Sequence, residues 1–208
     1  MSIRAITWDL GGVLLRTEDR QPRTRLAEEL NLSYDEIDRI VFGSPSARQA
    51  SLGEITADQH WRNVCKMLSW PESRLQELQE RFWGGDRLDL ALIAFIQSLE
   101  PRYRMALLSN NWSDLHQALV DQWHIAGLFE VIVISAEIGL AKPEARIYQE
   151  TQARLGLQPE QIIFVDDFPE NVRTASELGW QAVPFKNSQQ AIAEIQRLID
   201  GDRTVKAI

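Results

Sequence analysis

The pattern of apolar and polar positions along the chain becomes regular at Leu88. From Leu88 to Leu99, apolar side chains recur at the spacing of one helix face. Short apolar runs then alternate with stretches of helical spacing, and another apolar run lies at 5–8. This alternation is typical of an α/β fold with a doubly wound parallel sheet. The other predicted strands are 103–108, 131–134, 162–165 and 182–185, and the other predicted helices are 114–119, 144–155, a helix ending at Leu178, and a last one through Ile192 and Ile199.

Residues 18–86 have a different pattern, with several short amphipathic helices and no convincing strand. Ser33 and Thr56 stand where a side chain would cap the start of a helix. The pair Gly84-Gly85 ends the pattern and is a natural exit hinge. We therefore predict an inserted all-helical cap at 18–86 and a Rossmann-like core formed by 1–17 and 87–208.

Polar residues stand directly after three of the predicted strands. Asp9 follows the first strand, Ser109-Asn110 follows the strand at 103–108, and Asp166-Asp167 follows the strand at 162–165. Right-handed crossovers place the carboxyl ends of parallel strands at one edge of the sheet. The sequence thus predicts that these side chains meet in one crevice beneath the helical cap.

Composition and charge exclude several classes of partner. The chain has 208 residues, 44% of them hydrophobic, and a net charge of −8 without any basic block. Nucleic-acid and anionic-membrane surfaces need clustered Lys and Arg, so neither partner is expected. Cys65 is the single cysteine, which rules out an intramolecular disulfide and favours a reducing compartment. We expect a cytoplasmic protein that is a monomer or a homodimer.

The predicted crevice has the residues for phosphoryl transfer. Three carboxylates from two strands need a positive partner, and Mg²⁺ is a hard cation that takes oxygen ligands. Lys142, beside Pro143 at the start of a predicted helix, could add a point charge, and Ser109 a hydroxyl donor. A carboxylate nucleophile, a metal and a lysine together describe this chemistry.

Four motifs in order resemble the haloacid dehalogenase superfamily of hydrolases with a C1-type helical cap. They are Asp9-Leu10-Gly11-Gly12-Val13, Ser109-Asn110, Lys142-Pro143, and the run from Val165 to Asn171. The chain is similar above all to the bacterial sugar-phosphatase branch and to the N-terminal phosphatase domain of soluble epoxide hydrolases. The resemblance implies a Mg²⁺-dependent phosphomonoester hydrolase acting on a small phosphorylated metabolite, such as a sugar phosphate.

The resemblance also implies a role for each matching residue. Asp9 would be the nucleophile that forms an aspartyl-phosphate, Ser109 would bind a phosphoryl oxygen, and Lys142 would offset negative charge. The implied metal ligands are Asp9, the carbonyl of Gly11, Asp167 and Asp166; the implied substrate-binding residues are Gly11, Gly12 and Asn110; and Asn171 would hold its loop.

Gly11 departs from the family pattern. Most phosphatases of the family have a second aspartate here, whose carbonyl binds Mg²⁺ and whose side chain acts as general acid and base. Glycine supplies only the carbonyl, and general acid–base help is commonly worth about 10²–10⁴-fold. Water, a cap residue, or a substrate with a good leaving group would have to compensate.

Two other functions stay open on the sequence. A metal-free 2-haloacid dehalogenase would also lack the second aspartate, although the pair Asp166-Asp167 favours a metal enzyme. A non-catalytic relative that binds a phosphorylated ligand would have lost turnover with its general acid. For specificity we expect the cap loop Gly53-Glu54-Ile55 to face the crevice; Trp61, Trp70 and Trp83 could stack on a sugar or pack between helices.

Overall fold

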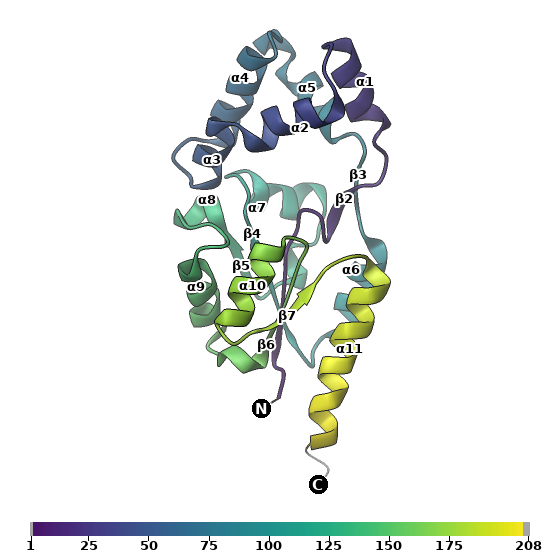
Figure 1. The fold of residues 1–208 in the computed structure, drawn as a ribbon, viewed down its shortest axis with the longest axis vertical. Coiled ribbons are helices and arrows are strands. Elements are labelled where there is room, and N and C mark those ends of the chain that lie inside the picture. Colours follow the sequence, from purple (N-terminus) through teal and green to yellow (C-terminus); the bar gives the residue numbers. More distant parts are fainter. Residues whose placement is uncertain (1, 206–208) are drawn as a thin grey trace.

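The computed structural model describes residues 2–205 and contains the predicted parallel sheet (Figure 1). All neighbouring strands of the five-stranded sheet are parallel, in the order β5-β4-β1-β6-β7. The fold class predicted from the sequence is confirmed. The strands are β1 (Ala5–Trp8), β4 (Arg104–Ser109), β5 (Val131–Ile134), β6 (Ile162–Asp166) and β7 (Gln181–Pro184).

Strand β1 is central, and its side chains alternate between two apolar layers. Ile6 and Trp8 belong to a hydrophobic cluster that includes residues of α6 and α11, while Ala5 belongs to a second cluster with residues of α9 and α10. Helices therefore cover both faces of the sheet, as Figure 1 shows. The helices of this part are α6 (Leu90–Leu99), α7 (Leu115–Gln117), α8 (Ser135–Ile138), α9 (Ala145–Leu155), α10 (Pro169–Glu177) and α11 (Ser188–Val205).

One predicted helix differs from the structure. The α-helix expected over 114–119 is the short α7, which passes into a π-helical turn at Ala118–Gln122. Asp114 occupies the N-cap position, but its side chain makes no capping hydrogen bond. The helical spacing predicted the element, but it could not distinguish an α-turn from the wider π-turn.

Helices α1 to α5 gather at one end of the molecule, beyond the carboxyl ends of the strands (Figure 1). They surround a hydrophobic cluster of their own, which includes Trp61 and Phe82. Ser33 and Thr56 cap their helices in complete capping boxes, as predicted. The limits 18–86 of this cap stay a prediction. The helices are α1 (Gln21–Glu29), α2 (Tyr34–Gly43), α3 (Pro45–Ser51), α4 (Ala57–Met67) and α5 (Leu75–Trp83).

A two-stranded antiparallel sheet, which the sequence pattern does not predict, joins the two parts. Strand β2 (Leu15–Thr17) pairs with β3 (Asp86–Leu88). Strands of three residues are too short to show alternation, and their partners lie far apart in the sequence. Next to this sheet, Glu18 and Asp19 both donate backbone hydrogen bonds to the carbonyl of Gly85. The predicted hinge at Gly84-Gly85 is thus hydrogen-bonded to the entering chain.

No helix within the described part of the chain combines the length and the apolar character needed to cross a membrane.

Candidate active site

Asp9 lies at the carboxyl end of the central strand, between the two strands that bring the other polar residues. Its backbone N–H donates to the carbonyl of Val165 on β6 at 2.9 Å, which continues the strand pairing by one residue. Asp9 is therefore level with Asp166 on β6. On the other side, Ser109 ends β4 and is buried, although its side chain makes no hydrogen bond to Asp9 or Lys142 within the described residues.

Lys142 is buried between two carboxylates. Its Nζ lies 2.8 Å from Asp9 Oδ1 and 2.6 Å from Asp166 Oδ2, and its side chain is only 1% exposed. Burial alone would lower the pKa of Lys142, but the charges of Asp9 and Asp166 outweigh it and raise the pKa. The ammonium group therefore stays charged and holds the two carboxylates together.

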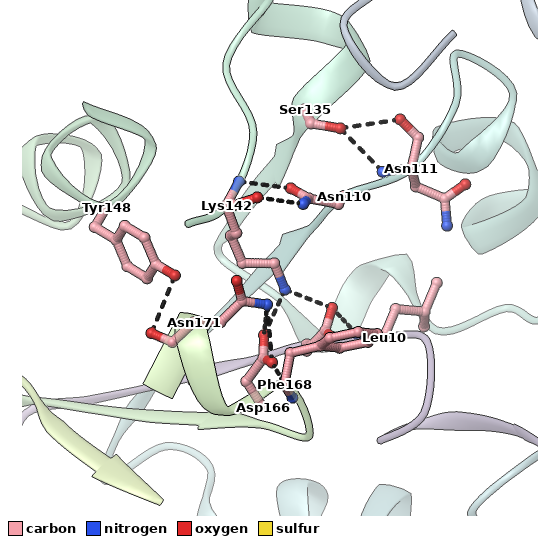
Figure 2. A network of polar contacts seen from close by, with 10 residues as sticks. Leu10, Asn110, Asn111, Ser135, Lys142, Tyr148, Asp166, Phe168 and Asn171 are labelled. Atoms are coloured by element: carbon pink, nitrogen blue, oxygen red, sulfur yellow. Dashed lines mark hydrogen bonds and ion pairs between the residues drawn. The ribbon is translucent and has the colours of Figure 1, made fainter. Parts of the chain in front are cut away.

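Several hydrogen bonds hold the Asp166 side chain in place, in addition to its contact with Lys142. Its Oδ1 accepts from the backbone N–H of Phe168 at 2.8 Å, and Asn171 Nδ2 donates to both of its oxygens, at 3.0 and 3.1 Å (Figure 2). Asn171 is in turn held by Tyr148, whose hydroxyl donates to the Asn171 carbonyl. Asp166 thus serves first as the counter-charge that positions Lys142, while its predicted role as a metal ligand stays a prediction.

The side chain of Asn110 positions the loop that carries Lys142. Asn110 Nδ2 donates to the Lys142 carbonyl at 2.8 Å, and the Lys142 N–H donates to Asn110 Oδ1 at 2.8 Å (Figure 2). The amide thereby satisfies both backbone groups of one residue on another loop. This structural role accompanies the substrate contact expected for Asn110, which stays a prediction.

One carboxylate oxygen of Asp167 is available to bind a cation. Its Oδ1 is buried and has no hydrogen-bond donor among residues 2–205. One oxygen from each of Asp9, Asp166 and Asp167 lies within 4.8 Å of the others. Burial, followed by the charge of Asp166, raises the pKa of Asp167. Because three carboxylates face a single ammonium, the residues fit a divalent cation that binds through oxygen.

The two oxygens of Asp9 have different surroundings. Oδ1 accepts from the backbone N–H of Leu10 at 2.7 Å and faces Lys142 Nζ. Oδ2 has no hydrogen-bond partner in the described part of the chain. Burial raises the pKa of Asp9 to about 7, with Lys142 acting in the opposite direction. A cation beside Asp9 would favour its ionised form, leaving one carboxylate oxygen as a nucleophile.

The two glycines after Asp9 differ in the space around them. Gly12 has a φ of +79°, and a Cβ at this position would overlap the Asp167 carboxylate. Gly11 has no atom within 4 Å of the position its Cβ would take. Gly12 therefore allows the chain to pass close to Asp167 in a left-handed conformation, whereas Gly11 has room for a side chain.

This difference predicts opposite results for two matched variants. We expect Gly12→Ala to displace Asp167 and weaken Mg²⁺ binding by about 10-fold or more. Substitutions of residues that support a metal ligand commonly lower the metal affinity by this much. Gly11→Ala adds the same methyl group to open space and should bind Mg²⁺ nearly as the wild type does. Calorimetric titration with Mg²⁺ measures both, and equal affinities for the two variants would contradict the prediction.

A cavity of about 430 Å³ lies between the helical cap and the core. The cap loop Gly53-Glu54-Ile55 is not among its lining residues, and the expectation that this loop faces the crevice at Asp9 stays a prediction. A Cβ on Gly53 would overlap the carbonyl oxygen of Ala136, which shows that this loop packs directly against α8. The lining comes from the end of α3 just before the loop, with Arg48, Ser51 and Leu52, and from core residues that include Asn110, Lys142 and Glu144.

Trp112 joins the site to the cap, a contact that the sequence pattern does not predict. It follows Asn110 by two residues, yet it is buried within the hydrophobic cluster of the cap. Its ring centroid lies 4.4 Å from that of His60 and 5.9 Å from that of Trp61. Trp61 and Trp70 are buried in the same cluster and Trp83 packs against it, so these rings pack between helices. A lone tryptophan in a loop gave no periodic signal that could have assigned it.

The arrangement has counterparts among known proteins. A family model described as a haloacid dehalogenase-like hydrolase matches residues 3–179. Bifunctional epoxide hydrolase 2 of Rattus norvegicus is 23% identical over 216 residues, which cover 95% of this chain and 39% of that protein. The chain thus spans well under half the length of that relative. Sesquiterpene phosphatase astK of Aspergillus oryzae is 23% identical over 200 residues, covering 95% of this chain and 97% of that protein.

A solved structure shares the fold. The HAD family enzyme BT-2542 of Bacteroides thetaiotaomicron, in complex with magnesium and inorganic phosphate, superposes with a TM-score of 0.74. The two sequences are 22% identical, and the match covers 89% of this chain and 95% of the other. At this identity the likeness shows the common fold.

Proposed function

Because the chain belongs to the haloacid dehalogenase-like hydrolase family, we propose that it is a Mg²⁺-dependent phosphatase that uses Asp9 as its nucleophile. The observation that carries the proposal is that, among the described residues, both Asp9 Oδ2 and the buried Asp167 Oδ1 lack a hydrogen-bond partner. In a metal-free dehalogenase, the buried Oδ1 of Asp167 would have no cation to bind. The phosphatases among the relatives, and the magnesium and phosphate bound to BT-2542, support the same reading.

The proposed reaction has two displacements at phosphorus. Asp9 Oδ2 attacks the phosphorus atom of the ester, the bond to the alcohol oxygen breaks, and the alcohol leaves with a proton that water supplies, since Gly11 has no acidic side chain. Water then attacks the phosphorus of the aspartyl-phosphate, which releases inorganic phosphate and returns Asp9 to its carboxylate form. Bound between Asp9 and Asp167, Mg²⁺ would neutralise charge on the phosphoryl oxygens. Lys142 holds Asp9 in place throughout, and Ser109 would donate to a phosphoryl oxygen.

A screen of phosphate esters with and without metal tests this function. We expect phosphate release from at least one small ester in the presence of Mg²⁺, and a fall of about 10²-fold or more after chelation with EDTA, because a metal Lewis acid supplies several kcal/mol of charge stabilisation. Readdition of Mg²⁺ should restore the rate. Halide release from 2-haloacids that survives chelation would instead support the dehalogenase alternative.

Gly11 allows a direct test of the missing general acid. Since the position has room for a side chain, Gly11→Asp should fold and should speed the release of poor leaving groups. We expect kcat for an alkyl phosphate to rise relative to kcat for p-nitrophenyl phosphate, by up to about 10²-fold, the lower range of general acid catalysis. The ratio of the two kcat values is the measurement. A ratio equal to that of the wild type would contradict the role assigned to this position.

A further inference from the structure

Consecutive residues of the loop after β4 hold different parts of the molecule, and we call residues 110–113 the β4 loop. The Asn110 side chain pairs with both backbone groups of Lys142. The backbone N–H of Asn111 donates to the Ser135 hydroxyl at 3.0 Å, and that hydroxyl donates to the Asn111 carbonyl at 3.1 Å (Figure 2). The first half of the β4 loop is therefore bonded to two neighbouring segments of the core.

The second half of the β4 loop is held by the cap instead. The Trp112 side chain is buried, and its ring centroid lies 4.4 Å from that of His60 on α4 and 6.1 Å from that of Phe42 on α2. The hydroxyl of Ser113 accepts a hydrogen bond at 3.2 Å from the N–H of Ala57, the first residue of α4. Two consecutive residues of a core loop are thus fixed by helices of the cap.

The position of the Trp112 ring restricts the position of Lys142. Protein interiors are close-packed, so a ring inside a cluster has few alternative positions. Two residues of extended chain span at most about 7 Å, which limits where the Asn110 amide can lie once the indole is fixed. The bonds of Asn111 to Ser135 hold the segment between them. The Asn110 amide then fixes the backbone of the lysine.

We propose that Trp112 is a positioning residue: packed in the cap, it holds Asn110 in the orientation that places Lys142 against Asp9. This inference rests on the proposed phosphatase function and adds to it a residue that contacts neither phosphate nor metal. The cap thereby becomes part of the support of the lysine. Loss of the indole would loosen the loop of Lys142 while the sheet stays in place.

Truncation of Trp112 should lower kcat and leave KM nearly unchanged. We expect Trp112→Leu and Trp112→Ala to reduce kcat by about 10- to 100-fold with KM within about threefold, because a displacement of about 1 Å at a catalytic group has effects of this size. Trp112→Phe keeps an aromatic ring in the cluster and should retain most of the wild-type kcat. Steady-state kinetics with Mg²⁺ on the ester found by the screen gives the measurement. Trp112→Leu is the milder change and serves if Trp112→Ala does not fold.

Trp70 provides the matched control in the same hydrophobic cluster. Its side chain is also buried there, at 7% exposed. Within the described part of the chain, the rings that contact Trp112 are those of Phe42, His60, Trp61 and Trp83, and not that of Trp70. Trp70→Leu therefore also leaves a cavity in the cap and should lower its stability, but should keep kcat within about twofold of the wild type.

A double-mutant cycle with Asn110→Ala tests the path to the lysine. If Trp112 acts through Asn110, the double variant Trp112→Leu/Asn110→Ala should have nearly the kcat of Asn110→Ala alone. The effects of Trp70→Leu and Asn110→Ala should instead be independent of each other. A double variant in which the losses from Trp112→Leu and Asn110→Ala multiply in full would overturn the path.

Hydrogen exchange at the Lys142 amide gives a measurement that does not need turnover. This N–H donates to Asn110 Oδ1, so its exchange rate reports how often that bond opens. We expect Trp112→Leu to raise the exchange rate of Lys142 by about 10-fold or more relative to that of Leu107 in β4, and Trp70→Leu to leave the ratio unchanged. Exchange followed by NMR on ¹⁵N-labelled protein resolves both amides.

The outcomes separate the two proposals. An unchanged exchange ratio in Trp112→Leu, or an equal fall of kcat in the Trp112 and Trp70 variants, would overturn the positioning role and leave the phosphatase function standing. If no ester were hydrolysed with Mg²⁺, the phosphatase proposal would fail, and the exchange ratio would still decide whether Trp112 fixes Lys142.

Discussion

Asp9→Asn is expected to reduce phosphate release by about 10⁴-fold or more, because the loss of a nucleophile removes the covalent route itself. The variant keeps the size of the side chain and an oxygen that can accept from Leu10 N–H. Replacing a buried carboxylate whose pKa is raised to about 7 removes a group that is costly to keep charged, so the fold should persist. Steady-state kinetics on the ester selected by the screen gives the measurement.

Controls separate the chemistry from the fold. Asp121→Asn changes an exposed aspartate away from the site and should retain wild-type activity. Thermal unfolding should show that Asp9→Asn is folded. In the wild type, a single turnover in ¹⁸O-labelled water should place the label in the released phosphate, because water attacks phosphorus; label in Asp9 would instead show attack at its carbonyl carbon. Retention of more than about a tenth of the activity would contradict the nucleophilic role.

Lys142→Met is expected to lower the free energy of unfolding by about 3–5 kcal/mol, the usual cost of removing one partner from a buried ion pair. The substitution leaves Asp9 and Asp166 side by side, and both side chains are buried, 8% and 0% exposed. Protonation of one carboxyl group limits the loss. Urea denaturation in EDTA is the measurement, because a bound divalent cation would compensate for the missing ammonium group.

A second substitution tests the cause. In the Lys142→Met background, Asp166→Asn removes one of the two carboxylates that have lost their cation. It should recover part of the stability without recovering activity. Lys186→Met, at an exposed position, is the matched control and should stay within about 0.5 kcal/mol of the wild type. A double variant no more stable than the single one would show that charge repulsion is not the cause.

The sequence alone was sufficient to predict the sheet and the meeting of three aspartates at one of its edges. Apolar runs such as 131–134 and 162–165 became β5 and β6 nearly residue for residue, because buried strands show their burial in composition. The topology of parallel strands then put Asp9, Asp166 and Asp167 at one edge, where their oxygens lie within 4.8 Å. These are consequences of local periodicity and of a general rule of handedness.

Contacts between segments distant in sequence were decided only by the tertiary structure. The β2–β3 pairing, the insertion of Trp112 into the cap and the packing of Gly53 on Ala136 each join two segments whose own patterns show no partner. The same is true of Asn110, whose amide pairs with the backbone of Lys142, and of Asp166, which Lys142 and Asn171 hold in place. Side-chain type indicates what a residue can bind, but not which neighbour the fold supplies.

Asp9, Gly11 and Gly12 illustrate both what the sequence determines and what only the tertiary structure decides. The sequence determined that a buried strand ends in a carboxylate followed by a flexible turn, because apolar side chains and glycine have fixed physical preferences. The tertiary structure decided which glycine is required. Gly12 is confined by Asp167, which directly follows β6 and is distant only in the sequence, while Gly11 faces open space. That distinction depends on the atoms nearby in space, which the order of residues along the chain does not specify.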